Sequence, residues 1–337
     1  MFNIRSSGTI SLFSSLLCFL VSCGTEVGNP VIKRPTTPRV VAQDSVEADL
    51  FDLVEGQFEF GDDDDASALS LATRNSEVFN LSASSCSSDK TQAQATFSAD
   101  RARESSSQAQ RYIVFIEREY SVEWKSPQGG LRCDAKNRIR KRRALLEGAS
   151  TLRTGRFART LEGVGELADT DYLAAEFVSE GFKKTLFDKV ENINGDLKLY
   201  SQVTWKKSRS NKIKTKQGDS LGSSESVVSD SSPMRIINTF RTENGKLSRT
   251  FELESGRSEN SQADGSLVSL EYQNLKFGSE SSCYATSGVL LGTVSQVDAD
   301  GLEPVSFRID FSKAVDGRPS IEFSDGQTVM LSGVCGQ

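Results

Sequence analysis

The feature that most restricts the fold of this chain is a two-residue repeat of apolar and polar side chains. In the stretch DLKLYSQVTW, the apolar residues that share one face are Leu197, Leu199, Val203 and Trp205. The stretch VSFRIDFS, residues 305–312, repeats the pattern. Successive side chains of a β-strand point to opposite faces, so the repeat predicts a sheet with one buried face and one solvated face.

Tight turns separate these strand-like stretches. Asn-Gly and Asp-Gly dipeptides tolerate the positive φ angles of short hairpins, and they begin at Asn194, Asn244, Asp264, Asp300, Asp316 and Asp325. The last three separate four strand-like runs between Gly288 and Val334, which predicts a meander. The predicted fold class is all-β: an antiparallel meander or sandwich, built as one body or as two β subdomains, with a short helix near 135–147.

Composition and local pattern predict the domain organisation. Apolar residues make up 36% of the chain, which is low for a compact enzyme of this length and favours thin, sheet-rich architecture. Leu50, Leu53 and Val54 fit one face of a helix. The predicted parts are a signal peptide at 1–22, a flexible tether at 23–45, an N-terminal β-rich region at 46–205, a polar low-complexity loop at 206–232 and a C-terminal β meander at 233–337.

A short apolar run near the start of the chain ends at a cysteine, within FLVSCGTEVGNP. Its last residues, Leu20-Val21-Ser22-Cys23, resemble the lipobox of bacterial lipoproteins. The resemblance implies cleavage before Cys23 and attachment of fatty acyl chains there, so that membrane lipid is the first partner. In Gram-negative members of that family, a residue other than Asp after the cysteine, here Gly24, implies passage to the outer membrane. Whether the body faces the periplasm or the cell surface is left open.

Four further cysteines follow once the signal is removed, namely Cys86, Cys133, Cys283 and Cys335. None belongs to a CxxC pair, so a zinc ribbon is not indicated. In an oxidising compartment, four such cysteines predict two disulfides. The pairings 86–133 and 283–335 are favoured over the two alternatives because each closes a contiguous block.

The chain contains no histidine. This excludes Ser-His-Asp and Cys-His catalytic groups and every histidine-bearing metal site. Because no other connected catalytic motif replaces them, we expect a non-enzymatic body without a cofactor. The net charge of −6 argues against a nucleic-acid partner.

One basic stretch is the best sequence candidate for an interaction surface. It comprises Arg138, Arg140, Lys141, Arg142 and Arg143, which together could hold phosphates or another anionic partner. Two other interpretations stay open, a solvated helix face and an ion-pair partner for the acidic segment 40–73.

Three weaker candidates have simpler explanations. The run GDDDD at 61–65 could bind calcium, but it lacks a ligand loop and is better explained as a solvated acidic loop. Ser87-Ser88-Asp89-Lys90 fits S-x-x-K, but the accompanying S-D-N element is absent. The aromatics that could stack on glycans are Tyr112, Trp124 and Tyr200, although such residues more often pack in a core.

Together these observations predict an outer-membrane lipoprotein whose non-enzymatic β body binds an envelope protein or glycan, or serves as structure. One alternative is a lipid or lipopolysaccharide carrier, which would need a continuous apolar concave face. Another is a carboxylate-based glycan hydrolase, which needs two acids across a sugar. With 46 acids in the chain, the sequence nominates no pair.

Overall fold

The computed structural model describes residues 37–58, 80–107, 110–133, 139–140, 147–163, 172–215, 218–243, 246–278, 284–296, 304–315 and 317–331. Within these residues lie one α-helix, α2 (Pro38–Phe58), and one 3-10 turn, η3 (Phe311–Lys313). The strands are β1 (Asn80–Cys86), β2 (Gln92–Ser107), β3 (Gln110–Lys125), β4 (Arg132–Cys133), β5 (Ile139–Arg140), β6 (Ser150–Gly163), β7 (Tyr172–Ile193), β8 (Asp196–Thr215), β9 (Gly218–Val228), β10 (Met234–Glu243), β11 (Lys246–Gln262), β12 (Ser266–Phe277), β13 (Ser287–Gln296), β14 (Val305–Asp310), β15 (Ser320–Phe323) and β16 (Thr328–Met330).

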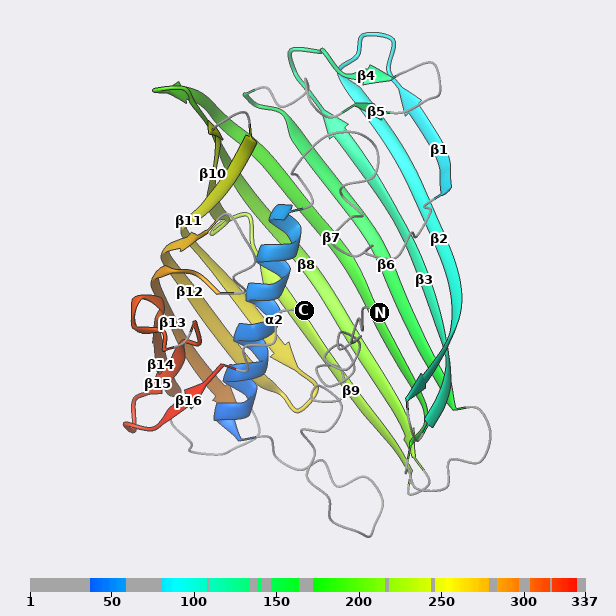
Figure 1. Cartoon of the computed structure of the whole chain (residues 1–337), viewed down its shortest axis with the longest axis vertical. Helices are drawn as coiled ribbons and strands as arrows, with labels where there is room; N and C mark the ends of the chain where they lie inside the picture. Colours follow the sequence, from blue (N-terminus) through cyan, green and yellow to red (C-terminus); the bar gives the residue numbers. More distant parts are fainter. Residues whose placement is uncertain are drawn as a thin grey trace, which may run out of the picture.

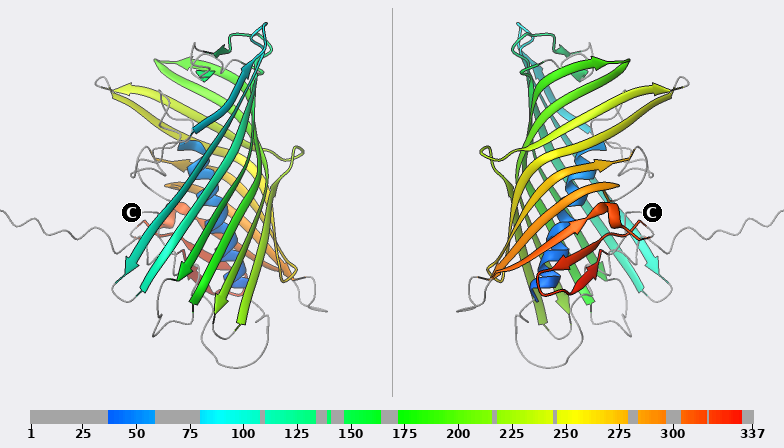
Figure 2. Two further views of the ribbon diagram at one scale, coloured as in Figure 1. Left: turned by 90° about the vertical axis from the view of Figure 1, so that its right-hand side faces the viewer. Right: turned by 90° about the vertical axis from the view of Figure 1, so that its left-hand side faces the viewer.

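All strands except β4 and β5 belong to one antiparallel sheet with the order β1-β2-β3-β6-β7-β8-β10-β11-β12-β13-β14-β15-β16. Strands β9 and β10 share one position between β8 and β11: β10 pairs with the first half of β8, and β9 pairs with the second half. The sheet is strongly twisted and curves around α2 (Figures 1 and 2). The predicted all-β, antiparallel fold class is therefore confirmed.

Helix α2 packs into the hollow of this sheet. It starts where the sequence supplies a start signal, because the N–H of Val41 donates to the carbonyl of Thr37 at 3.2 Å and Pro38 takes the first helical position. Its buried stripe, at helical spacing, consists of Val41, Ala42, Ser45, Val46, Asp49, Leu50 and Leu53. The expected helical face at Leu50 and Leu53 is present, but residues 38–45 were predicted as tether and are helix instead.

The main hydrophobic core lies between α2 and the strands from β8 to β15. Strand β12 alternates buried and accessible residues along most of its length, and its Val268, Leu270 and Tyr272 are completely buried. The predicted burial of Leu199, Val203 and Trp205 is confirmed, whereas Leu197 is exposed. We call the sheet face that contacts α2 the inner face and the opposite one the outer face.

The C-terminal meander follows the sequence prediction closely. Strands β13, β14, β15 and β16 pair in chain order, as expected for the four runs between Gly288 and Val334. In the turn between β7 and β8, Asn194 and Gly195 have φ angles of 55° and 88°, as a tight hairpin requires.

Two predictions of secondary structure are wrong. The stretch 206–232, expected to be a loop, contains the second half of β8 and all of β9, which pair with each other and with β7 and β11. Backbone pairing on both sides therefore fixes strands whose side chains are mostly polar. In the stretch predicted as a helix near 135–147, Ile139 and Arg140 form β5 by pairing with β4, and tertiary pairing overrides helix propensity there.

Candidate functional site

Most residues that the sequence singles out lie outside the described part of the chain. They are Cys23, Cys283, Cys335, Asp62, Asp63, Asp64, Asp65, Arg138, Lys141, Arg142 and Arg143. Arg140 lies in β5. Cys86 ends β1 and Cys133 ends β4, and these two strands contact each other. Both disulfide pairings remain predictions.

The serine of the S-x-x-K match has a structural role. Ser87 Oγ accepts the N–H groups of Thr91 at 3.1 Å and Gln92 at 2.9 Å, and it donates to the carbonyl of Gln92 at 3.1 Å. These bonds close the turn from β1 to β2. The hydroxyl therefore serves the turn rather than a substrate.

The aromatic residues suggested as glycan platforms have different surroundings. Trp124 is 5% exposed and packs in a small cluster with Ala93, Ala95, Val122 and Leu131, so it is a core residue. Tyr200 is half-buried, and the Lys189 ammonium lies 5.6 Å from its ring centre. Trp124 is therefore not accessible to a glycan, and Tyr200 is only partly accessible.

A buried carboxylate fixes α2 to the sheet. Asp49 is fully buried, and its Oδ1 accepts the hydroxyl of Ser226 at 3.0 Å. Its Oδ2 accepts the Ser258 hydroxyl, the Asn260 amide at 3.1 Å and the Tyr272 hydroxyl at 3.0 Å. Four neutral donors from β9, β11 and β12 thus satisfy a charge that would otherwise be very costly to bury.

The N-terminal end of α2 contacts β15, β16 and the turn between them. Arg39 forms an ion pair with Asp325 and stacks 5.8 Å from the ring centre of Phe323. Gln43 donates to the carbonyl of Met330 at 3.4 Å. These contacts direct α2 toward the strands from β9 to β16, which is the C-terminal half of the inner face.

Strand register shows which residues share the inner face in the other half. Val203 and Trp205 of β8 pack in the α2 core, so Lys207 and Arg209, at two-residue steps, share their face. Trp205 pairs with Lys183 of β7, and Lys183 pairs with Arg153 of β6. Three adjacent strands therefore bring these cations to one face.

We call Arg153, Lys183, Lys207 and Arg209 the basic inner patch. All four are half-buried. On the inner face of β2, β3 and β6 to β9, the positions whose side chains are described include no Asp or Glu. Each of the four cations nevertheless has an interaction partner within the chain.

Aromatic rings lie next to the patch. The guanidinium of Arg153 lies 4.5 Å from the ring centre of Tyr120, which is a cation–π contact. The rings of Phe157 and Phe177 meet edge to face at 6.0 Å. Arg153 and Lys183 are direct cross-strand neighbours, and each has an interaction partner within the chain.

Two glycines pair with each other across β6 and β7 on the inner face. Gly155 and Gly181 pair between Tyr120 and Lys207. A Cβ added at Gly155 would lie 2.9 Å from the Cβ of Tyr120, and one at Gly181 would lie 2.2 Å from the Lys206 carbonyl oxygen. Only glycine allows the neighbouring strands to approach this closely, and at Gly155 the space is taken by the side chain of Tyr120.

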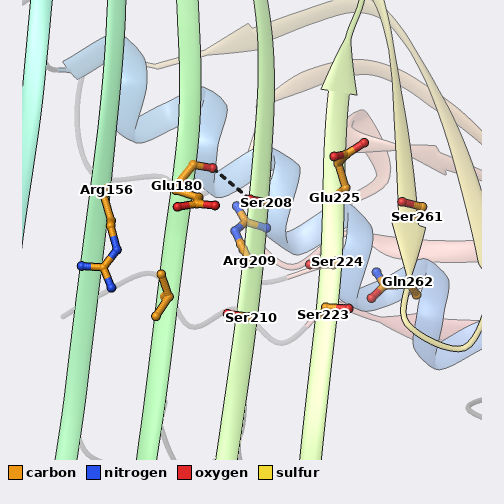
Figure 3. A pocket seen from close by; sticks show the side chains of 11 residues that line it. Arg156, Glu180, Ser208, Arg209, Ser210, Ser223, Ser224, Glu225, Ser261 and Gln262 are labelled. Atoms are coloured by element: carbon orange, nitrogen blue, oxygen red, sulfur yellow. Dashed lines mark hydrogen bonds between the residues drawn. The ribbon is translucent and has the colours of Figure 1, made fainter.

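The outer face has mixed charge and carries a pocket. Ion pairs join Arg156 to Glu117 at 3.5 Å and Lys206 to Glu225 at 2.9 Å. A cavity of about 460 Å³ opens over β6 to β9 and β11. Figure 3 shows its lining residues, which include Arg156, Glu180, Ser208, Ser210, Ser223, Glu225 and Ser261. Ser208 Oγ donates to the carbonyl of Glu180 at 3.5 Å.

Comparison with known proteins assigns no family to this chain, and the described residues show no metal site. No family model, curated protein or solved structure matches this chain. The described residues contain no group of three or more His, Cys, Asp or Glu side chains placed to hold a metal ion. Across the same residues, no helix is both long and apolar enough to span a bilayer.

The basic inner patch has no sequence motif, and sequence reasoning missed it. The usable signal is two lysine pairs, Lys183-Lys184 and Lys206-Lys207, within strands. Neighbouring strand residues point to opposite faces, so one lysine of each pair must reach each face. The second pair was assigned to a loop, which concealed this consequence.

Proposed function

We propose that this protein is an outer-membrane lipoprotein whose non-enzymatic β body binds an envelope component through the inner face of β6 to β8. The observation that carries the proposal is that the described contacts of α2 cover only one half of the inner face. The other half carries half-buried polar and aromatic side chains, among them Ser179 and Phe157. Such partly accessible side chains can contact a second molecule.

Membrane attachment rests on the Leu20-Val21-Ser22-Cys23 lipobox. Acyl groups attached to Cys23 would hold the body at the membrane, since each methylene that they bury in the bilayer adds about 0.8 kcal/mol of affinity. An oxidised Cys86–Cys133 bridge belongs to the same proposal. It is supported by the contact of β1, which ends at Cys86, with β4, which ends at Cys133.

The lipid-carrier alternative has less support. Acyl chains need a continuous aliphatic surface, but the described inner positions near the patch include Thr151, Ser179, Thr185 and Asn211 together with glycines and cations. Such a surface can donate hydrogen bonds and charge to a polar ligand. The rings of Tyr120, Phe157 and Phe177 lie on the same face, so its apolar residues are interrupted by polar ones rather than continuous.

Anchoring is tested by replacing the lipidated cysteine. The Cys23→Ala chain should stay unprocessed or be released from the outer-membrane fraction, while the unchanged chain should fractionate with that membrane and gain the mass of its acyl groups. An unchanged distribution and mass for Cys23→Ala would contradict lipidation at this residue.

Binding through the inner face is tested by photo-crosslinking in intact cells. A photoreactive residue at Ser179 would lie on the inner face, and one at Val178 would lie on the outer face of the same strand. Both side chains are half-buried, so the pair is matched. An adduct of one defined mass at 179 and its absence at 178 is expected, whereas equal labelling would contradict an inner-face site.

A glycan hydrolase is the second candidate, because two acids line the outer pocket. Glu180 and Glu225 both pair with Ser208, from opposite sides, so their backbones are about 10 Å apart. Inverting glycosidases place their carboxyl groups about 6.5 to 9.5 Å apart. Turnover of an envelope glycan that Glu180→Gln and Glu225→Gln each abolish would favour this candidate, and its absence would leave the pocket without catalysis.

A further inference from the structure

The cavity of Figure 3 continues into a second hollow of about 360 Å³ on the outer face, and the two share Arg156, Glu180 and Ser208. We call them together the outer groove. We propose that the outer groove binds a neutral oligosaccharide, without cleaving it, through serine hydroxyls and the ring of Phe182. This inference goes beyond the proposed function, because it concerns the opposite face of the sheet.

The groove has the size of a ligand site and is elongated. Its two parts have volumes of about 460 and 360 Å³, and small-molecule sites commonly occupy about 300 to 1,000 Å³. Ser261 and Phe182 mark its ends. They lie three strands and two residues apart in register, so their backbones are separated by about 16 Å. A ligand that contacts both ends is longer than a single sugar ring.

Serine hydroxyls line the end of the groove that is farther from Phe182. Ser210 of β8, Ser223 of β9 and Ser261 of β11 are exposed there (Figure 3). A serine hydroxyl both donates and accepts hydrogen bonds, as the hydroxyls of a sugar do. The lining therefore suits a ligand with donors and acceptors along its whole length.

The charged side chains of the groove are paired within the protein. Arg156 lies opposite Glu180 in the strand register and forms an ion pair with Glu117, while Lys206 forms one with Glu225. An ionic ligand would compete with these pairs. The hydroxyls of a neutral sugar can instead add hydrogen bonds to both members of each pair. The pairing therefore favours an uncharged ligand.

An accessible aromatic ring borders the other end of the groove. Phe182 is 39% exposed and lines the second hollow. The face of an aromatic ring carries partial negative charge, and it attracts the C–H groups on the flat side of a sugar ring. Phe182 thus offers apolar contact to one sugar unit, while the serines bind the hydroxyls of the others.

The test is calorimetric titration of the full chain with maltohexaose, cellohexaose and N-acetylchitohexaose, in a polyoxyethylene detergent that carries no sugar. Glucose controls for length, and hexagalacturonate controls for charge. The ring variant is Phe182→Ala. Its matched control, Phe115→Ala, removes a ring that is 38% exposed on the same face but does not line the groove. The hydroxyl variant combines Ser223→Ala with Ser261→Ala.

At least one neutral hexasaccharide is expected to bind the unchanged chain more tightly than glucose or hexagalacturonate, with an affinity that added salt does not lower. The ring and hydroxyl variants should each lose at least about fivefold in affinity, while Phe115→Ala should stay within about twofold. Equal affinities of the Phe182→Ala and Phe115→Ala chains would overturn the proposal. Tighter binding of hexagalacturonate, or no binding of any neutral hexasaccharide, would do the same.

Chromatography of the recovered sugar separates binding from turnover. Intact hexasaccharide is expected after the titration. Shorter products would overturn the proposal in favour of the hydrolase candidate, and their loss in Glu180→Gln would assign the cleavage to this groove.

Failure of this inference and failure of the proposed function are separable, because the two concern opposite faces. A photoreactive residue at Val178, which lines the groove, should form a glycan adduct whose mass differs from that of the Ser179 adduct. A specific adduct at Ser179 without hexasaccharide binding would reject the outer groove alone. Hexasaccharide binding without an adduct at Ser179 would reject the inner-face function alone.

Discussion

The two halves of the sheet are built on different principles. From β10 to β16 the strands shorten to only three residues in β16, yet this half holds most of the main core with α2. From β2 to β7 the strands reach 22 residues, but the described apolar cluster there has only five buried members. Among the described residues, the main core therefore lies in the half of the sheet that α2 contacts, and it includes the long strands β8 and β11.

The comparison shows how one sheet can serve two tasks. Side-chain burial against α2 stabilises the C-terminal half, since a buried Leu or Phe side chain contributes about 1.5 to 3 kcal/mol. The other half extends the sheet by backbone pairing, and the described residues of its inner face mix polar and cationic side chains with the rings of Tyr120, Phe157 and Phe177. Under the proposed function, stability and recognition lie in different parts of one continuous sheet.

The largest loss of stability is expected when the attachment of α2 to the sheet is broken. Asp49→Ala would leave the donors of Ser226, Ser258, Asn260 and Tyr272 without their acceptor, and it should lower the free energy of unfolding by about 3 to 5 kcal/mol. Urea unfolding measures the loss. The exposed acid Asp230 is the control, and its replacement by Ala should change stability by less than about 0.5 kcal/mol. Equal effects would contradict the anchoring role.

A matched pair of leucines compares the halves directly. Leu270→Ala opens a cavity at a fully buried site and should destabilise by about 2 to 5 kcal/mol. Leu186 of β7 is half-buried, and Leu186→Ala should cost about 1 kcal/mol. The same urea experiment measures both, and a larger loss at Leu186 would reverse the comparison.

A smaller effect is expected in the N-terminal cluster. Trp124→Leu reduces the largest side chain of that cluster and should destabilise β2 and β3 by about 2 kcal/mol. Hydrogen exchange should accelerate in β2 and β3 while the amides of β12 keep their protection. Equal acceleration in both regions would show that the halves unfold as one unit.

The smallest effect concerns a surface pair near the junction of the halves. Hydrogen bonds from Arg241 hold the pKa of Asp196 below its usual range. Such a carboxylate favours the folded state above its unfolded pKa, and this contribution is lost as pH falls through the folded pKa. Arg241→Gln should raise the pKa of Asp196 in an NMR titration and leave Asp310 unchanged. An unmoved Asp196 would remove Arg241 as the cause.

The sequence predicts the parts of the fold in which alternation and turns agree. The strands around Val203 and Phe307, the turn at Asn194 and the C-terminal meander all follow from local pattern. The strand at 206–215 does not, because Lys206 to Lys212 are polar on both faces and carry no period-two signal. Its pairing partners are set by register over long sequence separations.

The candidate site is harder to predict for the same reason. Arg153, Lys183 and Lys207 are separated by about thirty and then by about twenty-four residues, and only the pairing of three strands brings them together. The helix was missed in part because Pro38 was interpreted as a tether residue, although it opens α2. The basic stretch near Arg140 attracted attention because its charges are adjacent in sequence, which is not how this sheet gathers charge.

The most direct test of the unequal halves is hydrogen exchange of the unchanged protein, followed by mass spectrometry at increasing urea. Amides of β11, β12 and β13 should exchange only through global unfolding, and those of β2, β3 and β6 should exchange through local opening at lower free energy. Equal opening free energies in the two halves would contradict the account.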